Sequence, residues 1–272
     1  MIHRALILAK DVPDIEFSIR VADQLFENPP EPQYKPEGGH AVWTYTRRIG
    51  EPMHDSTWMI PDSSFWYYSG PKSGFSTFRK DVIHYDQPIL SKIPKMIWRG
   101  VVWTNAEIRK PLIEVTANKD WSDVKEIVWQ DGKVKDDFVS FLDHCQYAMN
   151  VHTEGRSWSG RLKYLISCHA VSFVHELKWT THYYHLLQAT GPRRNYVPVE
   201  RDFSDLEAKV DMIMSNAEEA QVIADNAVAL FRDRYLTPAA EACYWRRLFR
   251  EYATVSFTPK SKDNGMAFEE FV

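Results

Sequence analysis

Short apolar runs and helically spaced apolar positions follow one another along most of this chain, which predicts alternating strands and helices. The predicted strands cover residues 14–19, 42–45, 95–103, 126–129, 147–152, 170–175 and 195–199. The predicted helices cover residues 75–92, 107–117, 137–144, 159–169, 181–188, a segment from 204, 216–234 and 238–252. Such alternation is typical of right-handed βαβ units around a parallel sheet, which binds ligands where its strands end. The pattern predicts an α/β fold.

Capping residues mark several helix starts in the last third of the chain. Ser204–Glu207 and Ser215–Glu218 both have the Ser-x-x-Glu pattern of a capping box. Thr237 followed by Pro238 is a typical opening pair for the last helix. Residues 27–57, in contrast, are rich in Pro, Gly and His, and predict a long loop region with a single strand.

The loop between the predicted strand 147–152 and the next helix carries the clearest candidate chemistry. It contains Gly155, Ser159, Arg161 and Lys163, directly after Glu154. Backbone N–H groups at a helix start, together with an arginine and a lysine, favour a bound phosphate. We expect a diphosphate, most simply that of a nucleotide. The alternative is an ordinary capped helix whose charged side chains face solvent.

Two other phosphate motifs do not fit this loop. Gly155 and Gly160 have the glycine spacing of a P-loop, but Arg161 and Leu162 stand where that motif needs Lys and Ser or Thr. No G-x-G-x-x-G occurs in the chain. The sequence therefore argues against a P-loop NTPase and against a nicotinamide enzyme.

Several short motifs follow one another along residues 13–255. They are Trp98–Gly100, Arg109–Leu112, the block Asp143–Tyr147 with Asn150, Gly155, Ser159, Arg161, Lys163 and Cys168, then Asn195–Val199, Asp202–Leu206 and Tyr244–Trp245. In these motifs the chain resembles the CAP10-type glycosyltransferases (glycosyltransferase family 90), which include the Rumi-type protein O-glucosyltransferases and fungal capsule xylosyltransferases. The segment Ile60–Trp66 is typical of fungal members.

The resemblance implies a GT-B-like fold with two Rossmann-type halves and a cleft between them. Residues 1–94 would form an incomplete acceptor-side half and residues 95–240 the half that binds the donor nucleotide. Residues 241–272 would be a helix that crosses back, followed by a disordered tail. The implied reaction moves glucose or xylose from a UDP-sugar to a hydroxyl of a protein or glycan, with inversion and without a covalent intermediate.

The same resemblance assigns residues to the donor. Arg99, Gly100 and Arg109 would contact the nucleotide alongside Glu154, Gly155, Ser159, Arg161 and Lys163. Fixed positive charge would stabilise the departing diphosphate. Taken without the motif, Arg109 could simply begin a helix face.

Asp23 is the candidate catalytic base, because it follows Phe17 at the family's spacing. A base is needed to take the proton of the acceptor hydroxyl. The alternative is an aspartate that caps the helix beginning at Gln24. Asp62 is the second candidate, and we expect it to shape the acceptor pocket together with Trp66.

Composition and charge agree with a globular enzyme. The chain has 272 residues, 44% of them hydrophobic, and a formal net charge of −4. This charge gives no reason to expect nucleic acid as a partner, and we expect a monomer. Three cysteines occur, without a C-x-x-C pair, and we interpret Cys145 and Cys168 as buried free thiols, with a disulfide as the alternative.

Metal and location follow from absences in the sequence and from the resemblance. No Asp-x-Asp occurs and His182-x-x-His185 lacks a third ligand, so we expect no metal cofactor, with Mn²⁺ as the alternative from the capsule branch. No apolar run is long enough to span a membrane. The resemblance implies the lumen of the endoplasmic reticulum or Golgi, and a chain whose amino-terminal targeting portion is missing.

Two rival functions remain beside the transferase. One is a degenerate family member that binds a nucleotide-sugar or glycan without catalysis, because the motif around Asp23 departs from the family pattern. The other is a phosphate-binding hydrolase.

Overall fold

The computed structural model of the chain describes residues 1–7, 9, 11–22, 42–66, 74–130, 133–134 and 137–260. Its α-helices are α1 (Ile2–Leu6), α2 (Pro52–Asp55), α3 (Phe75–Tyr85), α4 (Ala106–Thr116), α5 (Phe141–His144), α6 (Leu162–Leu165), α7 (Leu206–Ser215), α8 (Ala217–Ala227) and α9 (Pro238–Ala253). A π-helix, Val228–Tyr235, continues α8. Short 3₁₀ turns cover Ser63–Phe65, Ile89–Ser91, Val102–Thr104 and Tyr184–Leu186.

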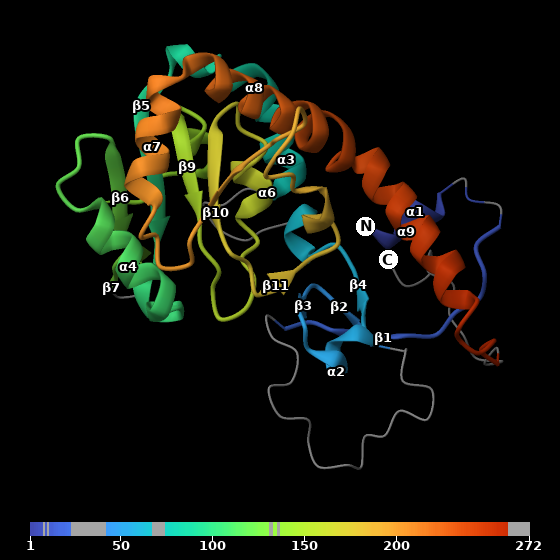
Figure 1. Cartoon of the computed structure of the whole chain (residues 1–272). Helices are drawn as coiled ribbons and strands as arrows, with labels where there is room; N and C mark the ends of the chain where they lie inside the picture. Colours follow the sequence, from blue (N-terminus) through green and yellow to red (C-terminus); the bar gives the residue numbers. More distant parts are fainter. Residues whose placement is uncertain are drawn as a thin grey trace.

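A five-stranded parallel sheet forms the centre of the fold (Figure 1). Its strands, in spatial order, are β12 (Val197–Val199), β10 (Val171–His175), β9 (Tyr147–His152), β5 (Ile93–Gly100) and β6 (Ser122–Glu126). All four pairings are parallel. Every residue of β10 is buried, as is usual for a strand covered on both faces. The α/β prediction is confirmed.

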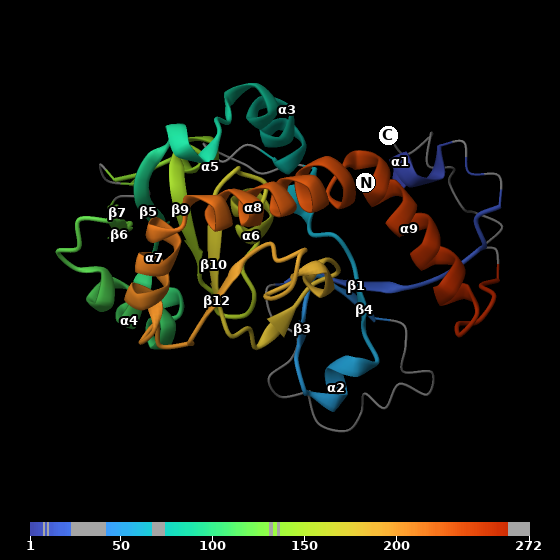
Figure 2. The same cartoon turned by 45° about the horizontal axis from the view of Figure 1, so that its top comes forward.

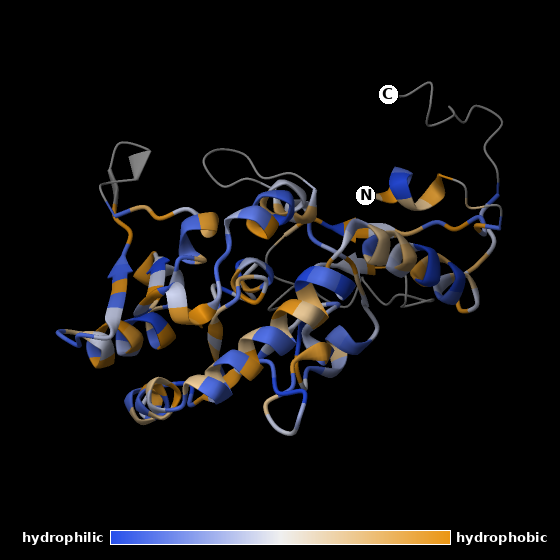
Figure 3. Ribbon diagram, turned by 90° about the horizontal axis from the view of Figure 1, so that it is seen from above, coloured by the Kyte–Doolittle hydropathy of each residue, from blue (hydrophilic) through white to orange (hydrophobic). Residues whose placement is uncertain are grey.

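Helices cover both faces of this sheet (Figure 2). On one face, α4, α7 and α8 bury apolar side chains such as Leu112, Val210 and Ile223 against Trp98 and Phe173. On the other, α3, α6 and the π-helix pack around Tyr164 and Phe231. These helices are amphipathic, and Figure 3 shows hydrophobic and hydrophilic residues along each ribbon.

The amino-terminal residues form a second, smaller region. Here β1 (Ser18–Arg20), β2 (Val42–Thr44) and β4 (Trp58–Met59) make a three-stranded parallel sheet. The ring of Phe17 stacks on Trp43 at 3.7 Å, and α9 adds Trp245, Phe249 and Tyr252 to this cluster. Figure 1 shows α9 reaching away from the five-stranded sheet to lie beside α1.

Two further strand pairs occur in the described residues: β3 (Arg47–Arg48) with β11 (Trp179–Thr180), and β7 (Trp129–Gln130) with β8 (Lys133–Val134).

Strand order identifies where a ligand would bind. Numbered by their order in the chain, the central strands run 2-1-3-4-5 across the sheet, with the order reversing between β5 and β9. In doubly wound sheets of this order, the ligand crevice lies at the reversal, outside the ends of the strands. We call the edge of the sheet at which these parallel strands end the carboxyl edge, and the edge at which they begin the amino edge.

The amino edge carries a disulfide that the sequence analysis did not favour. Cys145, just before β9, is bonded to Cys168, just before β10. The interpretation of both residues as free thiols was wrong, because the chain turns back after α6 and brings two cysteines 23 positions apart within bonding range. Cys243 is a free and exposed cysteine.

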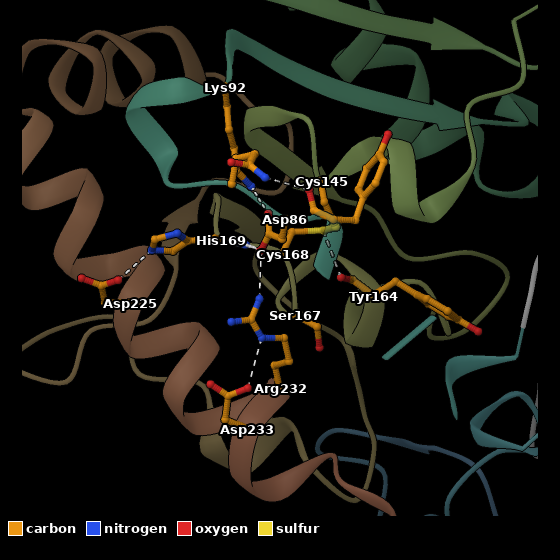
Figure 4. A network of polar contacts seen from close by, with 12 residues as sticks. Asp86, Lys92, Cys145, Tyr164, Ser167, Cys168, His169, Asp225, Arg232 and Asp233 are labelled. Carbon is orange, nitrogen blue, oxygen red and sulfur yellow. Dashed lines mark hydrogen bonds and ion pairs between the residues drawn. A yellow bond between two sulfur atoms is a disulfide. The ribbon is translucent and has the colours of Figure 1, made fainter. Parts of the chain in front are cut away.

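Beside the disulfide lies a network of charged side chains (Figure 4). Asp86 accepts hydrogen bonds from Lys92 Nζ at 2.5 Å, from Arg232 Nη1 at 2.9 Å and from the backbone N–H of His169 at 2.7 Å. Its two carboxylate oxygens therefore tie the end of α3 to the start of β5, to the π-helix and to the turn before β10. This network supports the fold at the edge remote from the reversal.

Local expectations were correct for some elements and wrong for others. The predicted strand 147–152 coincides with β9, whereas the predicted helix 159–169 is reduced to the four residues of α6. Neither predicted capping box forms: α7 begins after Asp205 without a side-chain cap, and α8 is capped by Asn216. Thr237 does cap α9.

Candidate functional site

Trp98 lies at the carboxyl edge, where the strand order reverses between β5 and β9, and contacts several side chains of the site. Its indole Nε1 donates to Thr153 Oγ1 at 3.0 Å, which joins the two strand ends. Two guanidinium groups lie by its ring: the Cζ of Arg109 is 5.7 Å from the ring centroid and that of Arg161 is 5.4 Å away. Cation–π contacts of this kind hold arginines near an aromatic face. Two sequence-predicted arginines therefore converge on one indole.

Arg109 is held rigidly in the first turns of α4. Its Nε donates to the Glu154 carbonyl at 3.2 Å, and its Nη1 donates to the Val101 carbonyl at 2.6 Å and to Thr104 Oγ1. Burial lowers the pKa of Arg109 to about 10, so the side chain stays charged at neutral pH. A buried cation without a carboxylate among these partners favours the arrival of an anion.

Arg161, in the loop after β9, contributes the second guanidinium group of this site. Its Nη1 donates to the Arg99 carbonyl at 2.8 Å, which spans from this loop to β5. Arg161 is the N-cap of α6, and this helix has only one turn. The predicted contribution of a helix dipole is therefore small, and the positive charge of the site comes from side chains.

Close packing explains two of the predicted glycines. A Cβ on Gly100 would lie 2.5 Å from the Trp98 ring and 3.1 Å from Arg161 Nη2, so no other residue fits beneath the indole. A Cβ on Gly155 would lie 3.3 Å from the Trp158 carbonyl and 3.7 Å from Arg109 Nη2. The Gly155 carbonyl also accepts a hydrogen bond from the Asn105 amide at 2.8 Å.

Glu154 is buried and binds protein groups. Its Oε1 accepts from the backbone N–H groups of Lys178 and Trp179 at 3.0 and 2.9 Å, and its Oε2 accepts from Arg201 Nη1 at 2.9 Å. Burial raises the pKa of Glu154, and Arg201 opposes that shift. Sequence reasoning missed Arg201; its place just after β12, at the same edge, was the available signal.

Arg99 points away from this group. Its Nη2 forms an ion pair with Asp123 Oδ1 at 2.8 Å, and its Nε donates to the Asp137 carbonyl at 2.9 Å. Asp123 is also bound by the Tyr147 hydroxyl at 2.6 Å. The backbone carbonyl of Arg99, by contrast, belongs to the site, because Arg161 binds it. Its predicted side-chain contact with the nucleotide stays a prediction.

Lys163 and Asp62, predicted for different tasks, bind one another. Lys163 Nζ lies 3.0 Å from Asp62 Oδ2 and 3.2 Å from Oδ1, and both side chains are buried. The ammonium charge is thus neutralised inside the protein. This pair connects the loop of the carboxyl edge to the turn that follows β4.

The remaining candidates are less constrained. Ser159 is half-buried, and its carbonyl accepts a bond from the Tyr184 hydroxyl at 3.5 Å. Trp66 is exposed, with the Arg4 guanidinium 4.7 Å from its ring. Asp23 lies outside the described residues, so its predicted role as base stays a prediction.

The described residues contain no group of three or more His, Cys, Asp and Glu side chains placed to hold a metal ion. His182 instead packs against the rings of Phe65, Tyr183 and Tyr244. Within the same part of the chain, no helix combines the length and apolar character that a membrane span requires.

Comparison with known proteins identifies the family. The sequence matches the model described as "Glycosyl transferase family 90" over residues 2–268. The chain belongs to glycosyl transferase family 90. The resemblance drawn from short motifs is therefore confirmed over nearly the whole chain.

The relatives in this family carry protein O-glucosyltransferase names. Protein O-glucosyltransferase 1 of Homo sapiens is 27% identical over 273 residues, covering 92% of this chain and 65% of that protein. The enzyme of that name from Rattus norvegicus gives the same figures. Protein O-glucosyltransferase 2 of Danio rerio is 33% identical over 132 residues, covering 48% of this chain and 26% of that protein. This family 90 chain thus spans just under two thirds of the relatives that it matches over most of its length.

Proposed function

We propose that this family 90 protein moves a sugar from a UDP-sugar to a hydroxyl of a protein or glycan, with inversion at the anomeric carbon. The observation that carries the proposal is the convergence of Arg109 and Arg161 on Trp98 at the strand reversal. Glucose and xylose are the proposed sugars, and the names of the relatives favour glucose and a protein acceptor.

In this proposal, the two arginines stabilise the leaving group. The acceptor oxygen attacks the anomeric carbon, the bond from that carbon to the diphosphate oxygen breaks, and UDP leaves with the extra negative charge. Charged donors fixed in advance, in a site with little water, stabilise such charge most effectively. The carbonyl groups of Val101, Glu154 and Arg99 hold the two guanidinium groups before the donor arrives. Gly100 lets Trp98 and Arg161 pack closely, and Gly155 does the same for Arg109.

Asp23 is the proposed base that takes the proton of the acceptor hydroxyl. Asp62 is the less suitable candidate, because Lys163 and Ser64 already bind its carboxylate oxygens. Both carboxylate oxygens are thus already engaged with protein groups and are not free to bind an acceptor hydroxyl.

The proposed setting is an oxidising lumen, that of the endoplasmic reticulum or Golgi. The Cys145–Cys168 disulfide supports it, because disulfides persist in such compartments. We also propose that the three-stranded parallel sheet belongs to an acceptor-side half, and the five-stranded sheet to the donor half, of a GT-B-like enzyme.

A donor panel tests the function. UDP, UDP-glucose, UDP-xylose, UDP-galactose and GDP-mannose would each be added in a thermal-shift assay, because a ligand that binds only the folded state raises its stability. We expect stabilisation by UDP and by one UDP-sugar above the others. Transfer would then be followed as release of UDP with a protein acceptor. Stabilisation without any transfer would favour the degenerate binding protein, and release of sugar to water alone would favour a hydrolase.

Asp23→Asn tests the proposed base. The change nearly preserves shape but removes proton acceptance, so transfer should fall on the order of 10²-fold or more. The affinity for UDP should change little, because the base faces the acceptor. Asp14→Asn, at an exposed neighbouring aspartate, is the matched control. Full transfer activity in the Asp23 variant would return this residue to a helix-capping role and leave Asp62 as the next candidate.

A further inference from the structure

The Lys163 ammonium donates all of its hydrogen bonds to groups inside the protein. It has three protons to donate, and three acceptors lie within reach: Asp62 Oδ2 at 3.0 Å, Asp62 Oδ1 at 3.2 Å and the Gly160 carbonyl at 2.8 Å. The side chain is completely buried. A lysine held in this way does not reach out to a diphosphate.

Aromatic rings enclose the same ammonium. Nζ lies 4.9 Å from the ring centroid of Phe65, 5.7 Å from that of Trp158 and 5.3 Å from that of Tyr164. Gly160 is close as well, because a Cβ there would lie 3.4 Å from Nζ and 3.5 Å from the Trp158 ring. The position of the Gly160–Arg161 peptide is therefore set by this enclosure.

The partner carboxylate is fixed from the opposite side. Asp62 caps the turn Ser63–Phe65, and its Oδ1 accepts hydrogen bonds from the backbone N–H of Ser64 at 3.0 Å and from the Ser64 hydroxyl. The Phe65 carbonyl is in turn bound by Ser76 Oγ at 2.8 Å, at the start of α3. The acceptor of the ion pair thus belongs to a rigid segment 101 positions away in the chain.

We propose that Asp62 and Lys163 are positioning residues, and that their buried pair holds the Gly160–Arg161 peptide so that Arg161 meets the diphosphate of the donor. The inference rests on the proposed function and deepens it. Lys163 is then not a direct ligand of the phosphate, and Asp62 is not the base. Together they connect the segment around Asp62, on the acceptor side, to the donor loop that contains Arg161.

A small displacement of the Gly160–Arg161 peptide would move the Arg161 guanidinium, because two contacts fix the place of this group. The guanidinium must reach the Arg99 carbonyl at 2.8 Å while staying 5.4 Å from the Trp98 ring centroid. Both contacts depend on where the backbone leaves Gly160. If one partner is replaced, the ammonium or carboxylate that remains is an unpaired buried charge, and we expect it to shift toward water. The Gly160–Arg161 peptide beside it would then be displaced.

A second buried pair in the same fold offers a matched control. Lys92 and Asp86 at the amino edge are equally buried and lie 2.5 Å apart, remote from the strand reversal. Loss of either pair should destabilise the fold, but only loss of the Asp62–Lys163 pair should affect the donor.

The experiment measures the dissociation constant for UDP by calorimetry, together with the melting temperature, for Lys163→Met, Asp62→Asn and Lys92→Met. We expect the first two to weaken UDP binding about tenfold or more in the folded fraction, as misplaced ligating groups do. Lys92→Met should lower the melting temperature and leave the dissociation constant within about twofold of the parent value. The double variant Asp62→Asn/Lys163→Met should be no weaker than Lys163→Met alone.

Each result decides the proposal. Folded Lys163→Met and Asp62→Asn proteins that bind UDP as the parent does would overturn it, and so would an equal loss in Lys92→Met. If Lys163→Met does not fold, Asp62→Asn carries the test, because it preserves the shape and the bond from the Ser64 N–H. A parent protein that binds no UDP would refute the proposed function itself, whereas normal parent binding with unaffected variants refutes only the positioning role.

Discussion

The two edges of the central sheet use similar groups in different ways. At the amino edge, Asp86 is bound by a lysine, an arginine and a backbone N–H, so its charge is balanced within the protein (Figure 4). At the carboxyl edge, Arg109 is held by the carbonyl groups of Glu154 and Val101 and by the Thr104 hydroxyl, none of which carries a charge. The difference indicates that the balance of charge around a buried side chain, more than the number of charged groups, distinguishes the supporting network from the candidate binding site.

Acid should destabilise the fold at both edges of the sheet. Burial lowers the pKa of His144, just before β9, and that of His175, at the end of β10, to about 4, and it lowers the pKa of His182 to about 3. His175 Nε2 also accepts the Glu154 N–H at 3.0 Å, a bond that protonation would remove. Between the unfolded value of about 6.5 and these folded values, the unfolded chain binds protons that the folded chain does not. The free energy of unfolding should therefore fall as the pH falls through this window, and stay level above it.

Each such histidine contributes a slope of up to about 1.4 kcal/mol per pH unit. Glu154 and Glu241 oppose it, because burial raises their pKa values and the folded state then holds their protons longer. Denaturant unfolding at pH 7, 6 and 5 measures the slope. His175→Gln should flatten it, and the exposed His84→Gln should not. Equal stability at pH 5 and 7 would contradict this account.

Removal of the disulfide should affect stability alone. The Cys145–Cys168 bond closes a loop of moderate length at the amino edge, so the double change to Ala should cost about 2–4 kcal/mol, seen as a lower melting temperature. The affinity of the folded fraction for UDP should stay as in the parent. Cys243→Ala, at the exposed free thiol, is the control. A marked loss of UDP affinity would show that the two edges are coupled.

Arg161→Ala should have the opposite profile. It removes a charge-assisted hydrogen bond of about 1.5–3 kcal/mol, so UDP should bind about tenfold weaker or worse while the melting temperature changes little. Arg232→Ala at the amino edge should lower the melting temperature and leave UDP affinity as it is, because Arg232 pairs with Asp86. Calorimetry on both variants tests the contrast, and unchanged UDP binding by the Arg161 variant would remove the donor from this edge.

Chelation should have the smallest effect. The proposed site uses guanidinium groups where many sugar transferases use a metal, and the sequence has no Asp-x-Asp. EDTA should therefore leave the dissociation constant for UDP unchanged. Loss of binding that Mn²⁺ restores would show that the arginines act with a cation.

The sequence was informative where structure is local. The apolar run at residues 147–152 predicts β9 residue for residue, and Thr237 marks the start of α9. The helix expected over residues 159–169 was wrong in extent, because distant groups hold this segment: Asp62 binds Lys163, and Asn150 Nδ2 donates to the Leu165 carbonyl at 3.3 Å. Such contacts override local propensity.

For the site, motif spacing singled out the arginines but not their partners. Arg109 and Arg161 do lie together. The ion pair of Asp62 with Lys163 joins positions 101 apart, and the pair of Arg99 with Asp123 joins two neighbouring strands. No helical or strand period encodes either one. Their chemistry depends on a tertiary pairing that only the folded chain defines.

The disulfide has one further consequence for anyone who handles the protein. Cys145 and Cys168 enclose β9, the loop with Gly155 and Arg161, and α6 in a single covalent ring. A protease that cuts once within this ring leaves the two pieces of the polypeptide attached to each other. The cut chain should migrate near its original mass on a non-reducing gel and separate into fragments only after a thiol is added.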